Sequence, residues 1–174
     1  MPDRAFPVRN PAEPIRSPAD DAKAVPAFVL PACTSLGAVV DRELPACRRS
    51  GSSLVVLSIG LAGLETVVQQ HGAAVEEELL QAAWSRLRRH LRAADLAVRV
   101  ERSEFGAVLL NAAWPATAIV DARLSKALSR PYGLGVLEVA LSVRTGAAIY
   151  PRAGATGEAL AMAARQARAF KNSP

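Results

Sequence analysis

The sequence predicts an α+β domain in which a mainly antiparallel sheet is flanked by helices. Two observations lead to this prediction. Short β-branched runs, two of them joined by a tight turn, indicate strands and a hairpin, and amphipathic stretches between these runs indicate helices. A chain that mixes helices with a hairpin in this order is not a helical bundle. Its 174 residues are a usual length for one domain, so we expect a single folded unit.

Composition is that of a soluble globular protein, and the net charge favours an anionic partner. Apolar residues make up 51% of the sequence and aromatic residues only 5%, so the core must be built mainly from Ala, Val and Leu. The formal net charge is +5, which suits a nucleotide, a nucleic acid or a membrane surface without choosing among them.

Several classes of protein are excluded by simple counts. The longest nearly uncharged apolar run, Leu54 to Leu64, is too short to span a bilayer, which needs about 20 residues. No signal peptide is visible. Two cysteines, Cys33 and Cys47, are too few for a disulfide framework, and we expect both to be reduced. The sequence therefore predicts a cytoplasmic protein without membrane insertion, bound metal or cofactor.

Residues 1–27 differ from the rest of the chain. They hold six of the twelve prolines, with charged residues between them, which predicts a disordered leader ahead of a folded domain over 28–174. The first helix is predicted over 36–49 from its apolar spacing. Pro45 lies within it, so this helix is either kinked or begins later than the spacing indicates.

The next segments contain a buried strand and the clearest helix of the chain. A turn signal at 50–53 precedes the β-branched strand 54–59, and a short helix is predicted over 64–70. The helix over 75–91 has a continuous apolar stripe. Glutamates lie at its start and arginines towards its end, the order that the helix dipole favours.

The remaining elements follow from the same periodicities and complete a five-stranded sheet. In order they are strands over 96–100 and 105–110 joined by a tight turn, a helix over 115–128 with proline in its first turn, strands over 136–140 and 142–149, and a closing helix over 156–170.

The predicted hairpin carries a family resemblance. Residues 99–105 read Arg-Val-Glu-Arg-Ser-Glu-Phe, in the place of the Arg-apolar-Gly-Gly-Asp-Glu-Phe signature of GGDEF domains. Leu30-Pro31 before the first helix, Gly72 after the short helix and Gly146 to Pro151 at the last strand fit the same family in order and spacing. The chain thus resembles a GGDEF domain over residues 28–173. The resemblance implies the nucleotidyl-cyclase-like fold of diguanylate cyclases, which join two GTP molecules into cyclic di-GMP.

The same resemblance suggests that catalysis is lost. The family holds two metal ions with aspartates near the first strand, and these positions are Gly60 and Ala62 here. The two signature glycines, which let the backbone approach the nucleotide, are also replaced. We therefore expect a degenerate signature, no catalytic residues, no metal and no enzymatic activity. The signature positions are Glu101, Arg102, Ser103, Glu104 and Phe105, of which only the last two keep the family residue.

One ligand site of the family is matched. Arg92-Ala-Ala-Asp95 ends five residues before the signature, where the resemblance implies a product-binding site for cyclic di-GMP, and Arg123 on the following helix matches its secondary arginine. An arginine fork can donate to guanine O6 and N7, and a carboxylate can accept from N1–H and N2–H. We expect Arg92 and Asp95 to face outward beside the ligand. By itself such a pair is commonly a solvated surface ion pair.

Three hypotheses follow. The leading one is an inactive cyclic di-GMP receptor that regulates a protein partner, for example in exopolysaccharide, biofilm or motility control, with a homodimer as a possible form. The alternative is a ligand-independent protein–protein interaction scaffold. The third is residual cyclase activity. DNA binding is disfavoured because no recognition-helix motif or base-stacking aromatic accompanies the basic helix.

Overall fold

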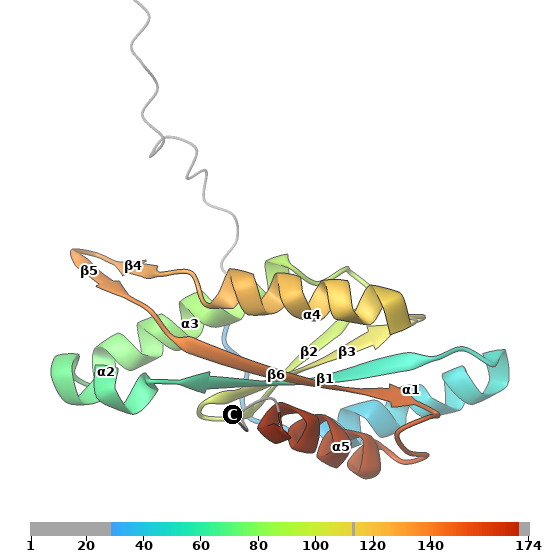
Figure 1. The fold of residues 1–174 in the computed structure, drawn as a ribbon. Coiled ribbons are helices and arrows are strands. Elements are labelled where there is room, and N and C mark those ends of the chain that lie inside the picture. Colours follow the sequence, from blue (N-terminus) through green and yellow to red (C-terminus); the bar gives the residue numbers. More distant parts are fainter. Residues whose placement is uncertain (1–28, 113, 171–174) are drawn as a thin grey trace, which may run out of the picture.

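The computed structural model describes residues 29–112 and 114–170 (Figure 1). The predicted leader, residues 1–27, lies outside the described residues. The helices are α1 (Leu36–Ser50), α2 (Leu64–His71), α3 (Ala73–Arg89), α4 (Trp114–Leu128) and α5 (Gly157–Phe170). The strands are β1 (Leu54–Ala62), β2 (Leu96–Glu101), β3 (Glu104–Leu110), β4 (Tyr132–Leu134), β5 (Leu137–Val139) and β6 (Ser142–Tyr150).

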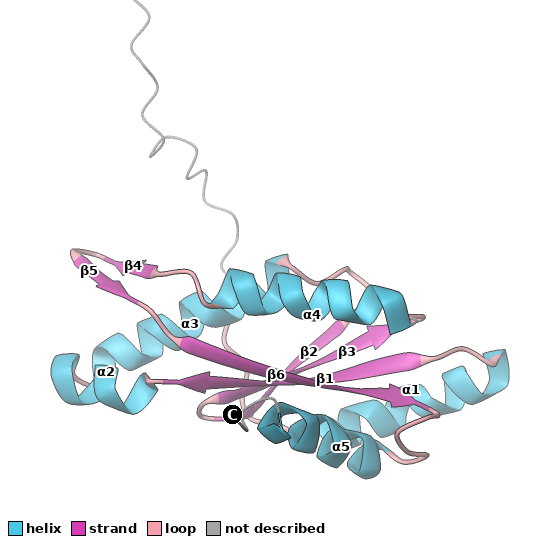
Figure 2. Cartoon of the chain, viewed as in Figure 1, coloured by secondary structure: helices cyan, strands magenta, loops and turns pink. Residues whose placement is uncertain are grey.

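The central sheet separates two layers of helices. Its strand order is β2-β3-β1-β6, and all neighbouring strands are antiparallel. Figure 2 shows α3 and α4 on one side of the sheet and α1 and α5 on the other. Along β1, Val55, Leu57 and Ile59 join the core under α3 and α4, whereas Leu54 and Val56 join the core against α1 and α5. Burial on both faces explains why β1 is apolar at nearly every position.

The prediction of a fifth strand in the central sheet is wrong for the described part of the chain. The predicted strand 136–140 is realised as β5, which pairs with β4 in a separate two-stranded sheet. Gly135 has φ +62° between them, so the chain folds back at once and β5 pairs with the segment just before it. Tyr132, Leu134 and Val139 bury their side chains in the core under α3 and α4.

Pro45 lies inside α1, and the helix begins where the apolar spacing predicts. The Ser35 hydroxyl caps its start by accepting from the amide of Ala38 at 3.2 Å. The alternative of a later start is therefore excluded. Cys33 is exposed, Cys47 is buried and both are free thiols, as expected. None of the described helices has the length and apolar character needed to cross a membrane.

Helix α5 lies unusually close to the sheet because β6 has glycine beneath it. A Cβ atom at Gly146 would lie 2.1 Å from the amide nitrogen of Arg168 and 2.2 Å from the carbonyl oxygen of Ala164. Only a residue without a side chain allows the α5 backbone to reach this position. The consequence is that α5 side chains can contact strands beyond β6.

We expect Gly146→Ala to lower the free energy of unfolding by about 1–3 kcal/mol, the usual cost of overpacking, because α5 must move away from the sheet. Urea denaturation would measure this loss. Gly133→Ala is the matched control, since no atom lies within 4 Å of the added methyl group, and its effect should stay within about 0.5 kcal/mol. Equal stability of the Gly146→Ala variant and the wild type would contradict the close packing.

Candidate functional site

The β2–β3 hairpin carries the signature positions and reaches over the end of β1. Glu101 and Glu104 are paired across the hairpin, and a bulge lies between Arg99 and Glu101. The carbonyl oxygen of Ser103, in the turn, accepts a hydrogen bond from the amide of Leu61 at 2.8 Å. The tip of the hairpin is therefore fixed to β1 by its backbone.

Glu104 is a buried carboxylate that both α5 arginines contact. Only 5% of the residue is exposed. Its Oε1 accepts from Arg165 Nε at 2.8 Å and from the Ser58 hydroxyl at 3.2 Å, and its Oε2 accepts from Arg168 Nη2 at 3.1 Å. The hydrogen bond to Glu104 also raises the pKa of Arg165. Both carboxylate oxygens are thus occupied by groups of the protein itself.

The Arg168 guanidinium also occupies the space beside Gly60 that a side chain at that position would need. Gly60 lies opposite Glu104 on β3 and Arg144 on β6. A Cβ atom at Gly60 would lie 3.1 Å from Arg168 Nη1. Within the described ranges, no three His, Cys, Asp or Glu side chains gather as a metal ion would require. The residues at this edge of the sheet therefore do not fit the pair of metal ions that the resemblance implies.

On its other side the hairpin is attached to α3. The guanidinium of Arg102 forms a two-pronged ion pair with Glu76, in which Nη2 lies 2.6 Å from Oε2. The hydrogen bond from Arg102 lowers the pKa of the Glu76 carboxyl. Phe105 is buried and packs edge-to-face on Trp84, with 5.5 Å between ring centroids.

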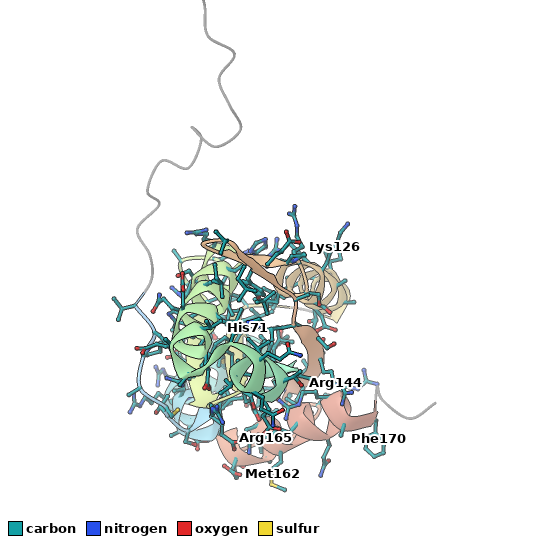
Figure 3. All side chains as sticks on the ribbon, turned by 90° about the vertical axis from the view of Figure 1, so that its left-hand side faces the viewer. His71, Lys126, Arg144, Met162, Arg165 and Phe170 are labelled. Atoms are coloured by element: carbon teal, nitrogen blue, oxygen red, sulfur yellow. The ribbon has the colours of Figure 1, made fainter. Side chains whose placement is uncertain are left out.

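Figure 3 looks onto the end of the molecule where Arg165 of α5 and Arg144 of β6 lie.

The turn between α3 and β2 contains the predicted ligand residues. Asp95 is buried, with 6% of the residue exposed, and its Oδ2 accepts from the backbone amide of Arg92 at 3.0 Å. Arg88 donates to the Asp95 carbonyl oxygen at 3.2 Å. Arg92 is exposed. Arg123, from α4, donates to the carbonyl oxygen of His90 at 2.8 Å, so it lies beside this turn within one chain.

Two expectations about Arg92 and Asp95 change. Asp95 does not face outward, because one of its oxygens closes the turn and the residue is buried. The two side chains also form no surface ion pair with each other among the described residues, which was the simpler explanation of the motif.

Sequence reasoning missed the partners of the hairpin. Arg165 and Arg168 are three residues apart on a helix, a spacing that puts them on one face. That spacing alone could have indicated a paired role. The residues that they meet depend on the packing of α5 across three strands, and the sequence does not specify this packing. Ser58 gave no signal, because it sits within an apolar run.

Comparison with known proteins relates nearly the whole described chain to one family. Residues 30–172 match the family model described as "Diguanylate cyclase, GGDEF domain". The chain is 31% identical over 118 residues to the bifunctional diguanylate cyclase/cyclic di-GMP phosphodiesterase MucR of Pseudomonas aeruginosa, covering 67% of this chain and 17% of MucR. It is 32% identical over 127 residues to an uncharacterized signaling protein of Caulobacter vibrioides, covering 72% and 15%. The chain spans less than a fifth of the length of these curated relatives.

Solved structures agree with this match. A sensory box/GGDEF family protein from Caulobacter crescentus superposes with a TM-score of 0.72 at 30% identity, over 78% of this chain and 88% of that one. The GGDEF domain of DgcB from Caulobacter crescentus, in complex with c-di-GMP, superposes with a TM-score of 0.71 over 83% and 92%. Its 14% identity shows the shared fold alone.

The prediction that the chain is not an enzyme is wrong. That prediction rested on single side chains at one edge of the sheet, such as Gly60 and Ala62. The match over residues 30–172 is to a family of diguanylate cyclases, and MucR is itself named as one.

We expect the Arg102–Glu76 pair to make stability depend on pH in acid. The folded pKa of Glu76 is lowered from 4.5, so its contribution is present above that value and is lost as the pH falls through the folded pKa. Glu76→Gln should therefore be less stable than the wild type at pH 7, and the difference should shrink in acid. Urea denaturation at several pH values would measure it. Glu77→Gln, an exposed neighbour, is the control, and a pH-independent difference for Glu76→Gln would contradict the pairing.

Removing the charge of Glu104 leaves two arginines without their buried partner. We expect Glu104→Gln to lower the free energy of unfolding by about 1–3 kcal/mol, the usual cost of breaking a buried charged hydrogen-bond set. Glu138→Gln is the control, because that exposed carboxylate makes no ion pair among the described residues. If both variants unfold at the same urea concentration, Glu104 does not fix the hairpin.

Proposed function

The chain belongs to the family of diguanylate cyclase GGDEF domains, and from that premise we propose that it is a receptor for cyclic di-GMP. The proposed ligand site is the turn between α3 and β2, with Arg92, Asp95 and Arg123 as its residues. The observation that supports it most is the approach of Arg123 to His90, which brings a second guanidinium beside the turn that holds Arg92. The DgcB domain, which has the same fold, was solved with c-di-GMP.

Arg92 and Asp95 have unused hydrogen-bonding capacity. The Arg92 side chain is exposed and makes no hydrogen bond or ion pair with any described residue. Asp95 uses Oδ2 to close the turn, whereas its Oδ1 bonds to none of the described residues. An arginine fork matches guanine O6 and N7, and a carboxylate oxygen matches guanine N1–H or N2–H. The turn can thus offer one donor group and one acceptor to a guanine edge.

The surroundings favour an anion. The last turn of α3 contains Arg86, Arg88 and Arg89, and the turn itself adds Arg92. Their summed positive potential attracts the two phosphodiester groups of cyclic di-GMP and favours its association. Ligand binding would then act on a protein partner, for example one that controls exopolysaccharide secretion, biofilm formation or motility, or on a second copy of the chain.

Cyclase activity is a second candidate function, which the family match favours. Incubation with GTP and Mg²⁺, followed by chromatography for cyclic di-GMP, measures it separately from binding. A ligand-independent scaffold would show neither binding nor turnover.

Titration calorimetry with cyclic di-GMP tests the receptor. We expect binding to the wild type at micromolar protein, and at least about tenfold weaker binding for Arg92→Ala, a change of about 1.4 kcal/mol. Arg152→Ala is the control, since Arg152 is exposed and its side chain makes no hydrogen bond with the described residues. No heat with the wild type, or equal affinity of Arg92→Ala and the wild type, would exclude the proposed site.

A further inference from the structure

A cleft separate from the hairpin and the α3–β2 turn lies where the ends of α3 and α4 meet the β4–β5 hairpin. These elements share one side of the central sheet (Figure 1). The cleft has a volume of about 510 Å³, within the usual range of small-molecule sites of about 300–1,000 Å³. Its charged lining comes from Arg86, Arg89, His90, Arg130 and Glu138.

Arg86 lines the cleft in a fixed position. Its guanidinium donates to the carbonyl oxygens of Ala127 at 3.2 Å, Arg130 and Pro131 at 2.9 Å, and it stacks 3.7 Å from the centre of the Tyr132 ring. Burial raises the pKa of Tyr132, so the phenol stays neutral at physiological pH. Carbonyl groups and a neutral ring do not cancel the charge of Arg86. The cleft therefore contains a positive charge that needs no reorganisation to meet an anion.

Two further guanidiniums line the cleft without a partner of their own. Arg89 and Arg130 are exposed, and neither side chain forms a hydrogen bond or ion pair with any described residue. His90 Nδ1 lies 2.8 Å from the Arg86 carbonyl oxygen and donates to it, which leaves Nε2 as the second polar atom of the ring. Glu138 is the one acidic group in this lining, and it forms no ion pair among the residues described. Three arginines thus outweigh one carboxylate.

We propose that this cleft binds a compact polyphosphate, either free or as the tail of a nucleotide. Arg89 comes from α3 and Arg130 from the segment after α4, so a ligand that engages both bridges two elements of the cleft and meets positive charge on each. Guanidinium forks match phosphate oxygens in geometry and charge. The diester phosphates of a cyclic dinucleotide carry one charge each, whereas a chain of phosphates concentrates several charges in the space that the cleft offers.

The cleft is distinct from the site proposed for cyclic di-GMP. Neither Arg92 nor Asp95 lines it. His90 lies between the two regions, since it lines the cleft and its carbonyl oxygen accepts a hydrogen bond from Arg123. The polyphosphate proposal does not depend on cyclic di-GMP binding, and either can fail alone.

Calorimetry of the full chain with inorganic triphosphate at low salt tests the cleft. We expect the wild type to bind, and the Arg89→Ala/Arg130→Ala variant to bind at least about tenfold more weakly. The control is Arg49→Ala/Arg152→Ala, which removes the same charge from exposed arginines elsewhere and should stay within about twofold of the wild type. A parallel titration with ATP separates the two sources, since tighter binding of ATP than of triphosphate indicates a nucleotide.

Three outcomes would overturn the proposal. They are no binding of triphosphate to the wild type, unchanged binding in Arg89→Ala/Arg130→Ala, and equal weakening in both double variants, which would indicate only general surface charge. Arg92→Ala distinguishes the two proposed sites, because it should weaken cyclic di-GMP binding at least about tenfold and leave triphosphate binding within about twofold. Circular dichroism of each variant confirms that it is folded.

Discussion

A buried carboxylate needs partners, and Glu104 receives them from the far end of the chain. Taking a charged group out of water is costly unless other charges and hydrogen bonds replace the lost hydration. Arg165 and Arg168 supply these from α5, and Ser58 adds a hydroxyl from β1. The requirement extends to the backbone: α5 must lie close enough to the sheet for its arginines to reach β3, and Gly146 leaves room for this approach. The two ion pairs of this one carboxylate thus link the signature hairpin to the packing of a whole helix.

The hairpin in turn couples the two helical layers. Glu104 attaches it to α5 on one side of the sheet, and Arg102 and Phe105 attach it to α3 on the other. Helix α3 has 17 residues, which corresponds to a length of about 25 Å. Glu76 near the start of α3 pairs with Arg102 of the hairpin, and the turn between α3 and β2, which is the proposed ligand site, follows the end of α3. A displacement of the hairpin would therefore act on the proposed ligand site through a rigid element and through β2, which joins the two directly.

Local patterns predicted the elements well, and long-range contacts explain the rest. The β-branched run of β1, the apolar stripe of α3 and the tight turn after Glu101 each depend on neighbours in sequence. The spacing of Arg92, Asp95 and Arg123 depends on a family pattern and could also be found from sequence. The ion pairs between the α5 arginines and Glu104 on β3 could not be found from sequence, because they depend on how a helix crosses three strands. The prediction of a fifth strand in the central sheet was wrong for a related reason. Gly135 allows β5 to pair with β4, and the sequence alone does not show whether β5 prefers β4 or the edge of the central sheet.

The arginines at and just after the end of α3 make different contacts, although they lie close together in sequence. Arg86 is held in place by carbonyl groups and the Tyr132 ring while it lines the cleft, and Arg88 donates to the carbonyl oxygen of Asp95. Arg89 and Arg92, although close in sequence, face different regions, the cleft and the ligand turn. Since His90 lines the cleft and its carbonyl oxygen accepts from Arg123, an anion on either side would alter the electrostatic field on the other. Of these four arginines, Arg86 and Arg88 are held by hydrogen bonds within the domain, whereas the side chains of Arg89 and Arg92 form no hydrogen bond or ion pair with the described residues and are the ones best placed to meet an anion.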